Sequence, residues 1–273
     1  MRRFEGKVVL VTGAGSGLGR ATAHRLVAEG AAVVVNDLTR DRAEATAVEL
    51  DGEAHAIGAD VADRSAVDAM FAEAIDRYGR VDGVANVAGI PFGAEGELER
   101  FADTIDAIAA EMAAGRPPST RWDFFVNISD ESFERMLRVH LFGTFYSTRA
   151  AARLMMEEGA GAIVNCASGA AVTGFPASAH YAAAKAGILG LTRAAATELG
   201  AWGVRVNAVA PGAMDTPMLA AAPPAFVAAG TAQTPLGRMA DPGEVAAVVA
   251  FLLSDDASYM TGQTVEPNGG MHM

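Results

Sequence analysis

Tyr181 and Lys185 stand four residues apart, thirteen residues after Ser168. Residues at this spacing share one face of a helix, so the lysine ammonium can lie beside the tyrosine phenol. A positive charge there favours the phenolate and makes the tyrosine usable as an acid or a base. Beside a bound dinucleotide, such a pair would interconvert a carbonyl and an alcohol.

A glycine-rich stretch, 12–19, follows a short apolar run and precedes a helical pattern. Glycines there permit a tight turn and let backbone N–H groups approach a pyrophosphate at the positive end of a helix. The residues expected to contact a dinucleotide are Gly13, Ser16, Gly17, Leu18 and Gly19. Their spacing, G-x-x-x-G-x-G, departs from the strict G-x-G-x-x-G fingerprint. A purely structural glycine turn is therefore the alternative.

Asp37 ends the second apolar run, eighteen residues after Gly19. A carboxylate at this place can accept hydrogen bonds from both hydroxyls of the adenosine ribose, and it repels a 2′-phosphate. We therefore expect NAD rather than NADP, with Leu38 beside the ribose, although Arg40 and Arg42 could swing inward. Asp60 and Val61, after the third run, are expected to hold the adenine, and an ordinary acid near a helix start is the alternative.

The elements that must position these residues are short β-branched runs alternating with longer alanine-rich stretches. The runs predict strands at 8–12, 32–37, 54–58, 81–86, 162–167, 204–209 and 264–266. The stretches predict helices at 17–29, 40–50, 64–78, 131–158, 178–201 and 243–254. Such alternation predicts an α/β fold of Rossmann type, a doubly wound parallel sheet of about seven strands flanked by helices.

Two segments do not follow this alternation. Residues 92–128 contain one short predicted helix, from about Glu99 to Ala113, and residues 211–241 are rich in Pro, Ala and Met. Segments of this length inside a compact domain are usually functional lids or disordered stretches. We expect one catalytic domain over 1–273, with an insertion at 92–128 and a substrate lid at 211–241.

The composition narrows the class of partner. The formal charge is −12, with 33 acidic against 21 basic residues, which argues against a nucleic-acid or anionic-membrane surface. No signal peptide or membrane-spanning stretch is expected, and the single cysteine, Cys166, fits a reducing compartment. A small-molecule substrate, a cytoplasmic location and no metal site are the expectations that follow.

With these motifs in order, together with Asn86-Val-Ala-Gly89 and Pro211-Gly212-x-x-x-Thr216, the chain resembles the short-chain dehydrogenase/reductase family. The resemblance covers nearly the whole length except 93–128. It implies that Tyr181 is the acid or base, that Lys185 supports it and binds the nicotinamide ribose, and that Ser168 orients the reacting oxygen. It also implies cofactor contacts from Asn86, Ala88, Gly89, Pro211, Gly212, Met214 and Thr216, and a homotetramer built on the helices at 131–158 and 178–201.

One position departs from the family pattern. Where most members carry an asparagine that completes a catalytic tetrad and a water relay, this chain has His140. An imidazole can donate and accept, so His140 can keep that role, and a packing histidine is the alternative. The other histidines are expected to pack or to face solvent, and His180 points about 100° away from Tyr181 around the helix.

The substrate is less well defined by sequence. Phe92, Phe175 and Met218 are expected to line an apolar substrate pocket with Ser168, and core or subunit contacts are the alternative for these three. His140, 33–38 and 128–131 resemble the (3R)-hydroxyacyl-CoA dehydrogenase branch, whereas 260–263 and 268–270 resemble 3-oxoacyl reductases and hydroxysteroid or sugar-alcohol dehydrogenases. A 3-hydroxyacyl or 3-oxoacyl thioester is the leading substrate class, and a hydroxysteroid or polyol is the alternative. A dinucleotide-binding protein without activity is a further alternative.

Overall fold

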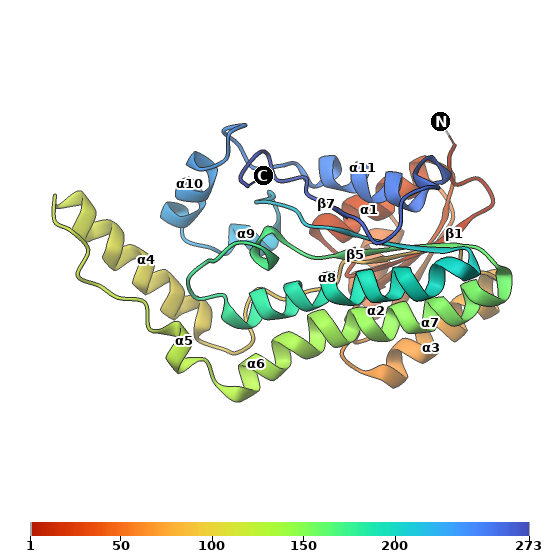
Figure 1. Ribbon diagram of the computed structural model, residues 1–273, viewed down its shortest axis with the longest axis horizontal. Helices are drawn as coiled ribbons and strands as arrows, with labels where there is room; N and C mark the ends of the chain where they lie inside the picture. Colours follow the sequence, from red (N-terminus) through yellow and green to blue (C-terminus); the bar gives the residue numbers. More distant parts are fainter. Residues whose placement is uncertain (1, 273) are drawn as a thin grey trace.

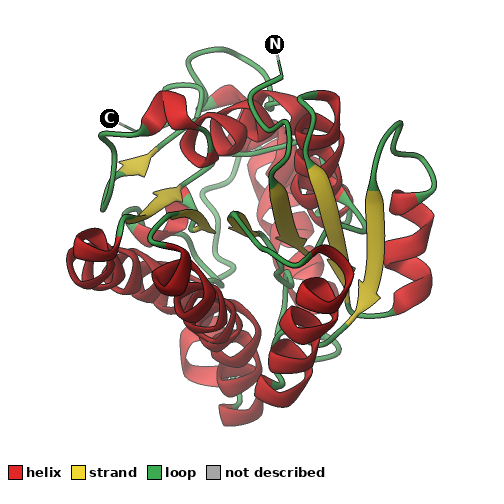
Figure 2. Cartoon of the chain, turned by 90° about the vertical axis from the view of Figure 1, so that its right-hand side faces the viewer, coloured by secondary structure: helices red, strands yellow, loops and turns green. Residues whose placement is uncertain are grey.

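The computed structural model describes residues 2–272, and it contains one parallel sheet with helices on both faces (Figure 1, Figure 2). The strands are β1 (Val8–Thr12), β2 (Ala32–Asp37), β3 (Ala54–Gly58), β4 (Gly83–Asn86), β5 (Gly161–Cys166), β6 (Val204–Val209) and β7 (Thr264–Val265). Their order is β3-β2-β1-β4-β5-β6-β7, so the chain winds outward from β1 in one direction and then returns to β4 and winds in the other. This order confirms the predicted doubly wound fold.

The sheet separates two layers of helices. One face is covered by α1 (Gly17–Ala28) and α11 (Pro242–Leu253), and the other by α3 (Arg64–Tyr78), α7 (Gly143–Glu158) and α8 (Ala179–Leu199). The short helix α2 (Arg40–Ala47) packs near β2 and β3. In the part of the chain that the structure describes, no helix combines the length and apolar character needed to cross a bilayer.

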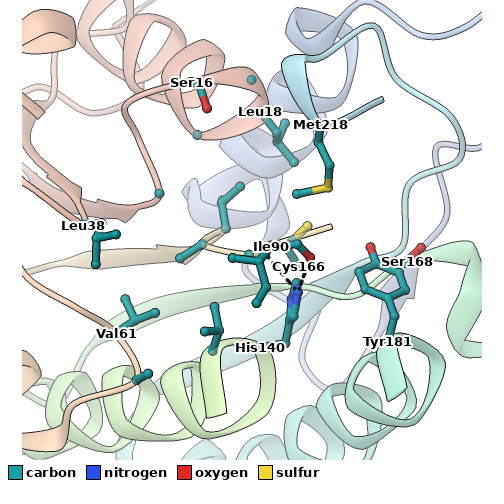
Figure 3. Close-up of a pocket in the computed structure, with 18 of the residues that line it drawn as sticks. Ser16, Leu18, Leu38, Val61, Ile90, His140, Cys166, Ser168, Tyr181 and Met218 are labelled. Atoms are coloured by element: carbon teal, nitrogen blue, oxygen red, sulfur yellow. Dashed lines mark hydrogen bonds between the residues drawn. The ribbon is translucent and has the colours of Figure 1, made fainter. Parts of the chain in front are cut away.

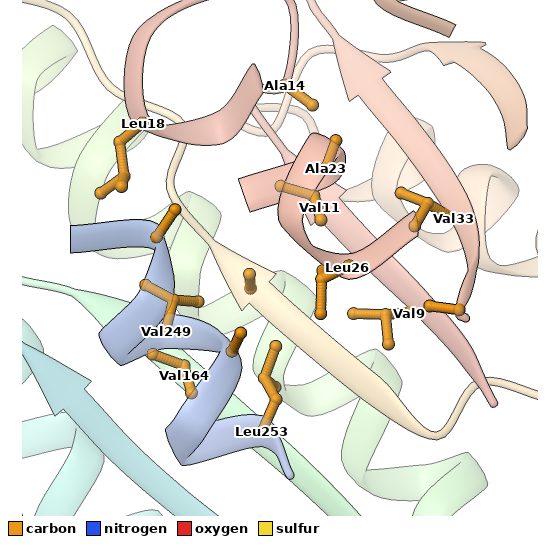
Figure 4. Close-up of a cluster of buried hydrophobic side chains, with 14 of the residues drawn as sticks. Val9, Val11, Ala14, Leu18, Ala23, Leu26, Val33, Val164, Val249 and Leu253 are labelled. Carbon is orange, nitrogen blue, oxygen red and sulfur yellow. The ribbon is translucent and has the colours of Figure 1, made fainter. Parts of the chain in front are cut away.

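Both faces of the sheet are apolar because both are covered. Along β1, Val9 and Val11 join the cluster beneath α1 and α11, whereas Val8 and Leu10 join the cluster on the opposite face. Figure 4 shows Val9 and Val11 facing Leu26 of α1, with Leu253 of α11 nearby. Successive strand residues point to opposite faces, so an uninterrupted valine and leucine run fits a strand buried on both sides.

One predicted helix differs from the structure. The sequence predicts a continuous helix over 131–158, but α6 (Asp130–Leu137) is followed by a π-helical turn at Arg138–Phe142 before α7 begins. The turn contains His140, whose side chain is tied to the backbone of Ile90. A wider turn of this kind changes the direction in which a helical side chain points, and it occurs often at functional sites.

The two segments outside the alternation also form helices. Residues 92–128 contain α4 (Glu97–Ala113), close to the predicted helix, and α5 (Phe124–Asn127). Residues 211–241 contain α9 (Pro217–Ala220) and α10 (Pro224–Ala232). Figure 1 shows α4 and α10 together at the same end of the molecule, where Phe101 and Phe226 pack ring against ring.

Candidate active site

The candidate site lies where the parallel strands end. The carboxyl ends of β1, β2, β4, β5 and β6 meet at one edge of the sheet, beside a cavity of about 690 Å³. Figure 3 shows Leu38 and Val61 at one end of this cavity and Ser168 and Tyr181 at the other. We call these the Asp37 end and the Tyr181 end. An elongated cavity at the switch point of a doubly wound sheet is a typical place for a ligand.

The glycine loop at the Asp37 end is shaped by the absence of side chains. A Cβ on Gly19 would collide with the Gly13 carbonyl, and one on Gly13 would lie 2.6 Å from the Cα of Ala88. Gly13 and Gly17 also have positive φ angles of 66° and 50°. The loop leads into α1 with Ser16 at its N-cap, and the Ser16 side chain makes no capping hydrogen bond. The first N–H groups of a helix have no partner within the helix, and Gly17, Leu18 and Gly19 at this helix start line the cavity, which suits an anion site.

Asp37 is held by backbone hydrogen bonds and by one cation. Its carboxylate accepts from the N–H of Gly15 at 2.9 Å and from the N–H of Leu38 at 2.9 Å. A Cβ on Gly15 would lie 2.6 Å from Asp37 Oδ2, so a larger residue there would displace the carboxylate. Arg42 Nε lies 2.9 Å from Asp37 Oδ1, and the arginine side chain is 56% exposed. The arginine therefore lies within reach of a ligand that binds Asp37.

At the Tyr181 end, α8 carries both Tyr181 and Lys185. Lys185 is buried, its Nζ donates to the Cys166 carbonyl at 2.7 Å, and it lies 5.6 Å from the centre of the Tyr181 ring. Ser168 follows β5 and begins a short 3₁₀ turn, with its Oγ accepting from the N–H of Ala170 at 3.2 Å. The structure thus brings the three expected catalytic residues together at one end of the cavity.

His140 is buried against the same tyrosine. Its ring lies 5.2 Å from the Tyr181 ring, edge to face, and it occupies space that a side chain on Gly89 would fill. Nε2 can donate to the Ile90 carbonyl at 2.9 Å or accept from the Ile90 N–H at 3.1 Å, depending on the tautomer. Burial, followed by the nearby Lys185 ammonium, holds the pKa of His140 well below 6.5. The imidazole is therefore neutral near pH 7.

Most of the remaining expected residues also line the cavity. The glycine-loop residues, Leu38, Asp60 and Val61 contribute at or near the Asp37 end. The other lining residues that the sequence predicted are Ala88, Gly89, Pro211, Gly212, Met214, Thr216 and Met218. Thr12, which is buried at the end of β1, accepts from the N–H groups of Val87 and Ala88 and so fixes the loop after β4.

Three expected residues lie elsewhere. Asn86 is the register partner of Asn165 in the neighbouring strand, and it donates to Asn165 and to Thr148 inside the protein. Its side chain therefore faces the core rather than the cavity, because register partners share one face of a sheet. Phe92 packs on Phe101 with ring centres 5.8 Å apart, and Phe175 is 40% exposed on the loop before α8. None of these three is among the residues that line the described cavity, and their expected contacts with cofactor or substrate stay predictions.

The structure also adds a wall that the sequence analysis did not include. The added residues are carried mainly by α6 and the start of the 92–128 segment, and they include Ile90, Gly93, Ala94, Glu131, Ser132, Glu134, Arg135, Arg138 and Val139. Arg135 and Glu131 precede His140 by five and nine residues, spacings that a regular helix of 3.6 residues per turn does not bring to one face. Because a π-helical turn intervenes, helical periodicity counted back from His140 would not have identified this wall.

Comparison with known proteins agrees with this geometry. A family model described as short chain dehydrogenase matches residues 7–225. The chain is 39% identical to levodione reductase of Leifsonia aquatica, with 98% of this chain and 95% of that protein covered. It is 38% identical to (3R)-3-hydroxyacyl-CoA dehydrogenase of Mus musculus, with 99% and 98% covered.

Two further comparisons extend over almost the full length. The chain is 34% identical to 3-oxoacyl-[acyl-carrier-protein] reductase FabG of Thermotoga maritima, with 98% of this chain and 99% of that protein covered. A crystal structure of levodione reductase superposes with a TM-score of 0.82 at 35% identity, and 98% of each chain is covered. The chain therefore belongs to the short-chain dehydrogenase family of oxidoreductases, as its motifs predicted.

Proposed function

We propose that this protein is an NAD(H)-dependent oxidoreductase that interconverts a secondary alcohol and a ketone, with Tyr181 as the acid or base. One observation carries the proposal. A single cavity has the glycine loop and Asp37 at one end and Tyr181, Lys185 and Ser168 at the other. This arrangement fits a dinucleotide lying along the strand ends with its reactive ring beside a proton donor.

The residues at the Asp37 end fit a dinucleotide. The tight glycine loop and the start of α1 would hold the pyrophosphate, and Asp37 would accept hydrogen bonds from the adenosine ribose. A buried carboxylate disfavours a 2′-phosphate, which supports NAD over NADP. The bound dinucleotide would supply the hydride chemistry that protein side chains lack.

At the Tyr181 end, the side chains of the protein would move the proton. The Lys185 ammonium, fixed by the Cys166 carbonyl, would stabilise the phenolate of Tyr181, and the Ser168 hydroxyl would orient the substrate oxygen. His140 would support the site as a neutral group, because its Nε2 holds the Ile90 backbone beside the Tyr181 ring. We propose that it replaces the family asparagine in this way.

A 3-hydroxyacyl or 3-oxoacyl thioester is the substrate class that we favour. Two of the relatives above are named for such substrates, and apolar residues such as Ile90 and Met218 line the cavity. We propose that residues 211–241 act as the lid over this substrate, since Met214, Pro217 and Met218 contribute to the lining.

Levodione, or another ketone outside the thioester class such as a ketosteroid, is the second candidate. It is favoured by the similarity to levodione reductase in sequence and structure. A nicotinamide-absorbance screen of 3-oxoacyl thioesters, levodione, ketosteroids and polyols, with NADH and NADPH in parallel, separates these classes. The highest kcat/KM should be found with NADH and a 3-oxoacyl thioester.

Tyr181→Phe tests the proposed mechanism directly. The variant keeps the aromatic ring and removes the proton, so turnover should fall roughly a hundredfold or more, within the range of general acid–base groups. NADH binding, followed by fluorescence, should stay nearly unchanged. Tyr259→Phe, at a fully exposed tyrosine, is the matched control. Full turnover of Tyr181→Phe would refute the role proposed for Tyr181.

We also propose a homotetramer, as in other members of the family. The exposed aromatic residues Phe142 and Phe145, on the π turn and α7, support a contact through this face. Light scattering that gave the mass of a stable monomer would exclude it.

A further inference from the structure

His180, the residue directly before Tyr181, is buried and has its two ring nitrogens facing different partners. Nδ1 accepts a hydrogen bond from the backbone N–H of Tyr181 at 2.9 Å. Nε2 is 3.5 Å from Glu97 Oε2 and has no hydrogen-bond partner among the described residues. The histidine thus lies between the start of α8 and the start of α4.

The Tyr181 N–H needs this acceptor. The first N–H groups of a helix have no partner within the helix. In α8, the N–H of Ala182 bonds the Ser178 carbonyl, whereas the Ser178 hydroxyl donates to the Phe175 carbonyl and caps no N–H group. The imidazole of His180 therefore takes the place of a cap for Tyr181.

This hydrogen bond fixes the position of the histidine proton. Because Nδ1 accepts from an N–H group, it carries no proton, and the neutral ring must carry its proton on Nε2. That proton points toward the side of the ring that faces Glu97. A carboxylate there stabilises this tautomer over the other one.

Glu97 is itself held in place. Its carboxylate accepts from Ser132 Oγ at 2.6 Å and from the N–H groups of Gly93 and Ala94 at 3.0 and 3.2 Å. Burial opposes its charge, but these hydrogen bonds outweigh burial and lower the pKa of Glu97. The glutamate is therefore a fixed negative charge at the base of the 92–128 segment.

We propose that His180 is a positioning residue for Tyr181, and that Glu97 holds His180 in the tautomer that this role requires. The inference rests on the proposed role of Tyr181 in proton transfer. It implies that the 92–128 segment contributes to catalysis, because Glu97 of that segment would orient the first turn of α8, which carries Tyr181. A displacement of the reacting group by about 1 Å can reduce turnover by about a hundredfold.

Two amide substitutions separate positioning from packing. His180→Asn places an amide near the position of Nδ1 and can still accept from the Tyr181 N–H, whereas His180→Gln places its amide near Nε2 and retains only the contact with Glu97. We expect His180→Asn to retain most of the turnover and His180→Gln to lose roughly tenfold or more in kcat. KM and NADH affinity should change little in either variant. Equal kcat values in the two variants, whether both high or both low, would overturn the proposal.

Nitrogen-15 NMR of histidine-labelled protein tests the tautomer without any turnover. We expect the shifts of His180, assigned by its loss in His180→Asn, to show a protonated Nε2 and a bare Nδ1. Glu97→Gln should weaken this preference, whereas Glu99→Gln, at an exposed residue of the same helix, should not. A protonated Nδ1 in the wild type overturns the proposal, even if the variants fail to fold. Full activity of Tyr181→Phe would instead overturn the proposed function. The tautomer seen by NMR does not depend on turnover, so the failure of the proposed function and the failure of this inference can be told apart.

Discussion

The two ends of the cavity are built in different ways. At the Asp37 end, the backbone turns tightly and side chains are missing where other parts of the chain approach, as at Gly13, Gly15 and Gly19. At the Tyr181 end, the surrounding segments are held by side chains that meet from distant parts of the sequence. The Asp37 end therefore depends on the lack of side chains at these glycines, and the Tyr181 end depends on side-chain contacts between distant segments.

An aromatic cluster shows how side chains from distant segments hold the structure around the Tyr181 end. Phe101 of α4 is buried among four other rings, with centres 5.0 to 6.3 Å away. The four rings belong to Phe92, Trp122, Phe124 and Phe226. Since Phe226 lies on α10, the cluster joins the 92–128 segment to the 211–241 segment. The comparison predicts that the two ends respond to mutation separately.

The largest effect is expected from Gly19→Ala at the Asp37 end. The added Cβ would collide with the backbone of Gly13 and Ala14, neither of which can move without opening the loop. Overpacking of this kind costs up to about 3 kcal/mol, which corresponds to roughly a hundredfold weaker NADH binding. Gly230→Ala, where the new Cβ meets open space, is the control and should bind NADH normally. Normal NADH affinity of Gly19→Ala would contradict a loop fixed by its backbone.

A smaller effect is expected from Asp37→Asn, measured as the ratio of kcat/KM for NADH to that for NADPH. The substitution removes the negative charge that would bond the ribose hydroxyls, and it releases Arg42 from its ion pair. Hydrogen bonds to a charged group are worth about 1.5–3 kcal/mol, so NADH should lose about tenfold or more while NADPH gains. Asp41→Asn, at an exposed residue of α2, should leave the ratio unchanged. An unchanged ratio in Asp37→Asn would remove the argument for NAD.

The sequence predicts the strands and the residues that directly follow them, because these features depend on residues that are neighbours in the chain. Buried strands are visible as valine-rich runs, and parallel strands bring their carboxyl ends to one edge, so Asp37, Ser168 and the glycine loop were correctly placed at the cavity. The sequence did not indicate that the Asn86 side chain faces the core, because its orientation follows its register with Asn165. In a strand, a difference of one residue reverses the face to which a side chain points.

Long-range contacts account for the other differences. His140, in the π turn, forms a hydrogen bond with the backbone of Ile90, fifty residues earlier. Helix propensity depends on neighbouring residues and cannot indicate so distant a partner. Glu97 and His180 are likewise far apart in sequence, and neither belongs to a spacing pattern that predicts their contact. Phe92 and Phe175 have the apolar character of pocket residues, but tertiary packing places the first in the aromatic cluster and the second at the surface.

The link between the two segments at the Tyr181 end predicts a coupling of intermediate size. Phe101→Leu, Phe226→Leu and the double variant form a double-mutant cycle. Its interaction free energy measures the contact between the two rings, whose centres are 5.0 Å apart. Such an aromatic pair contributes about 1 kcal/mol beyond the area that it buries. The free energy of unfolding in denaturant should show this coupling, and NADH affinity should not change. Additive effects would mean that the two segments are held independently.

The smallest effect concerns the pH dependence of stability at His140. The folded pKa of this residue lies well below its unfolded value of about 6.5, so below pH 6.5 the unfolded chain binds a proton that the native protein does not. The contribution of His140 to stability is therefore present above pH 6.5 and is lost as the pH falls toward the folded pKa. In His140→Asn this loss should disappear, while the amide can still bond the Ile90 backbone.

The measurement is the difference in Tm between wild type and His140→Asn at pH 7.5 and at pH 5.5. The wild type should lose about 2 °C or more relative to the variant over this interval, since about 1 kcal/mol corresponds to 2–4 °C for a chain approaching this size. Contributions that the two proteins share cancel in the difference. A difference that does not change with pH would mean that the native protein accommodates a protonated His140. In that case the Tyr181 end would tolerate a second buried cation beside Lys185, and its packing would be looser than the aromatic contact between His140 and Tyr181 indicates.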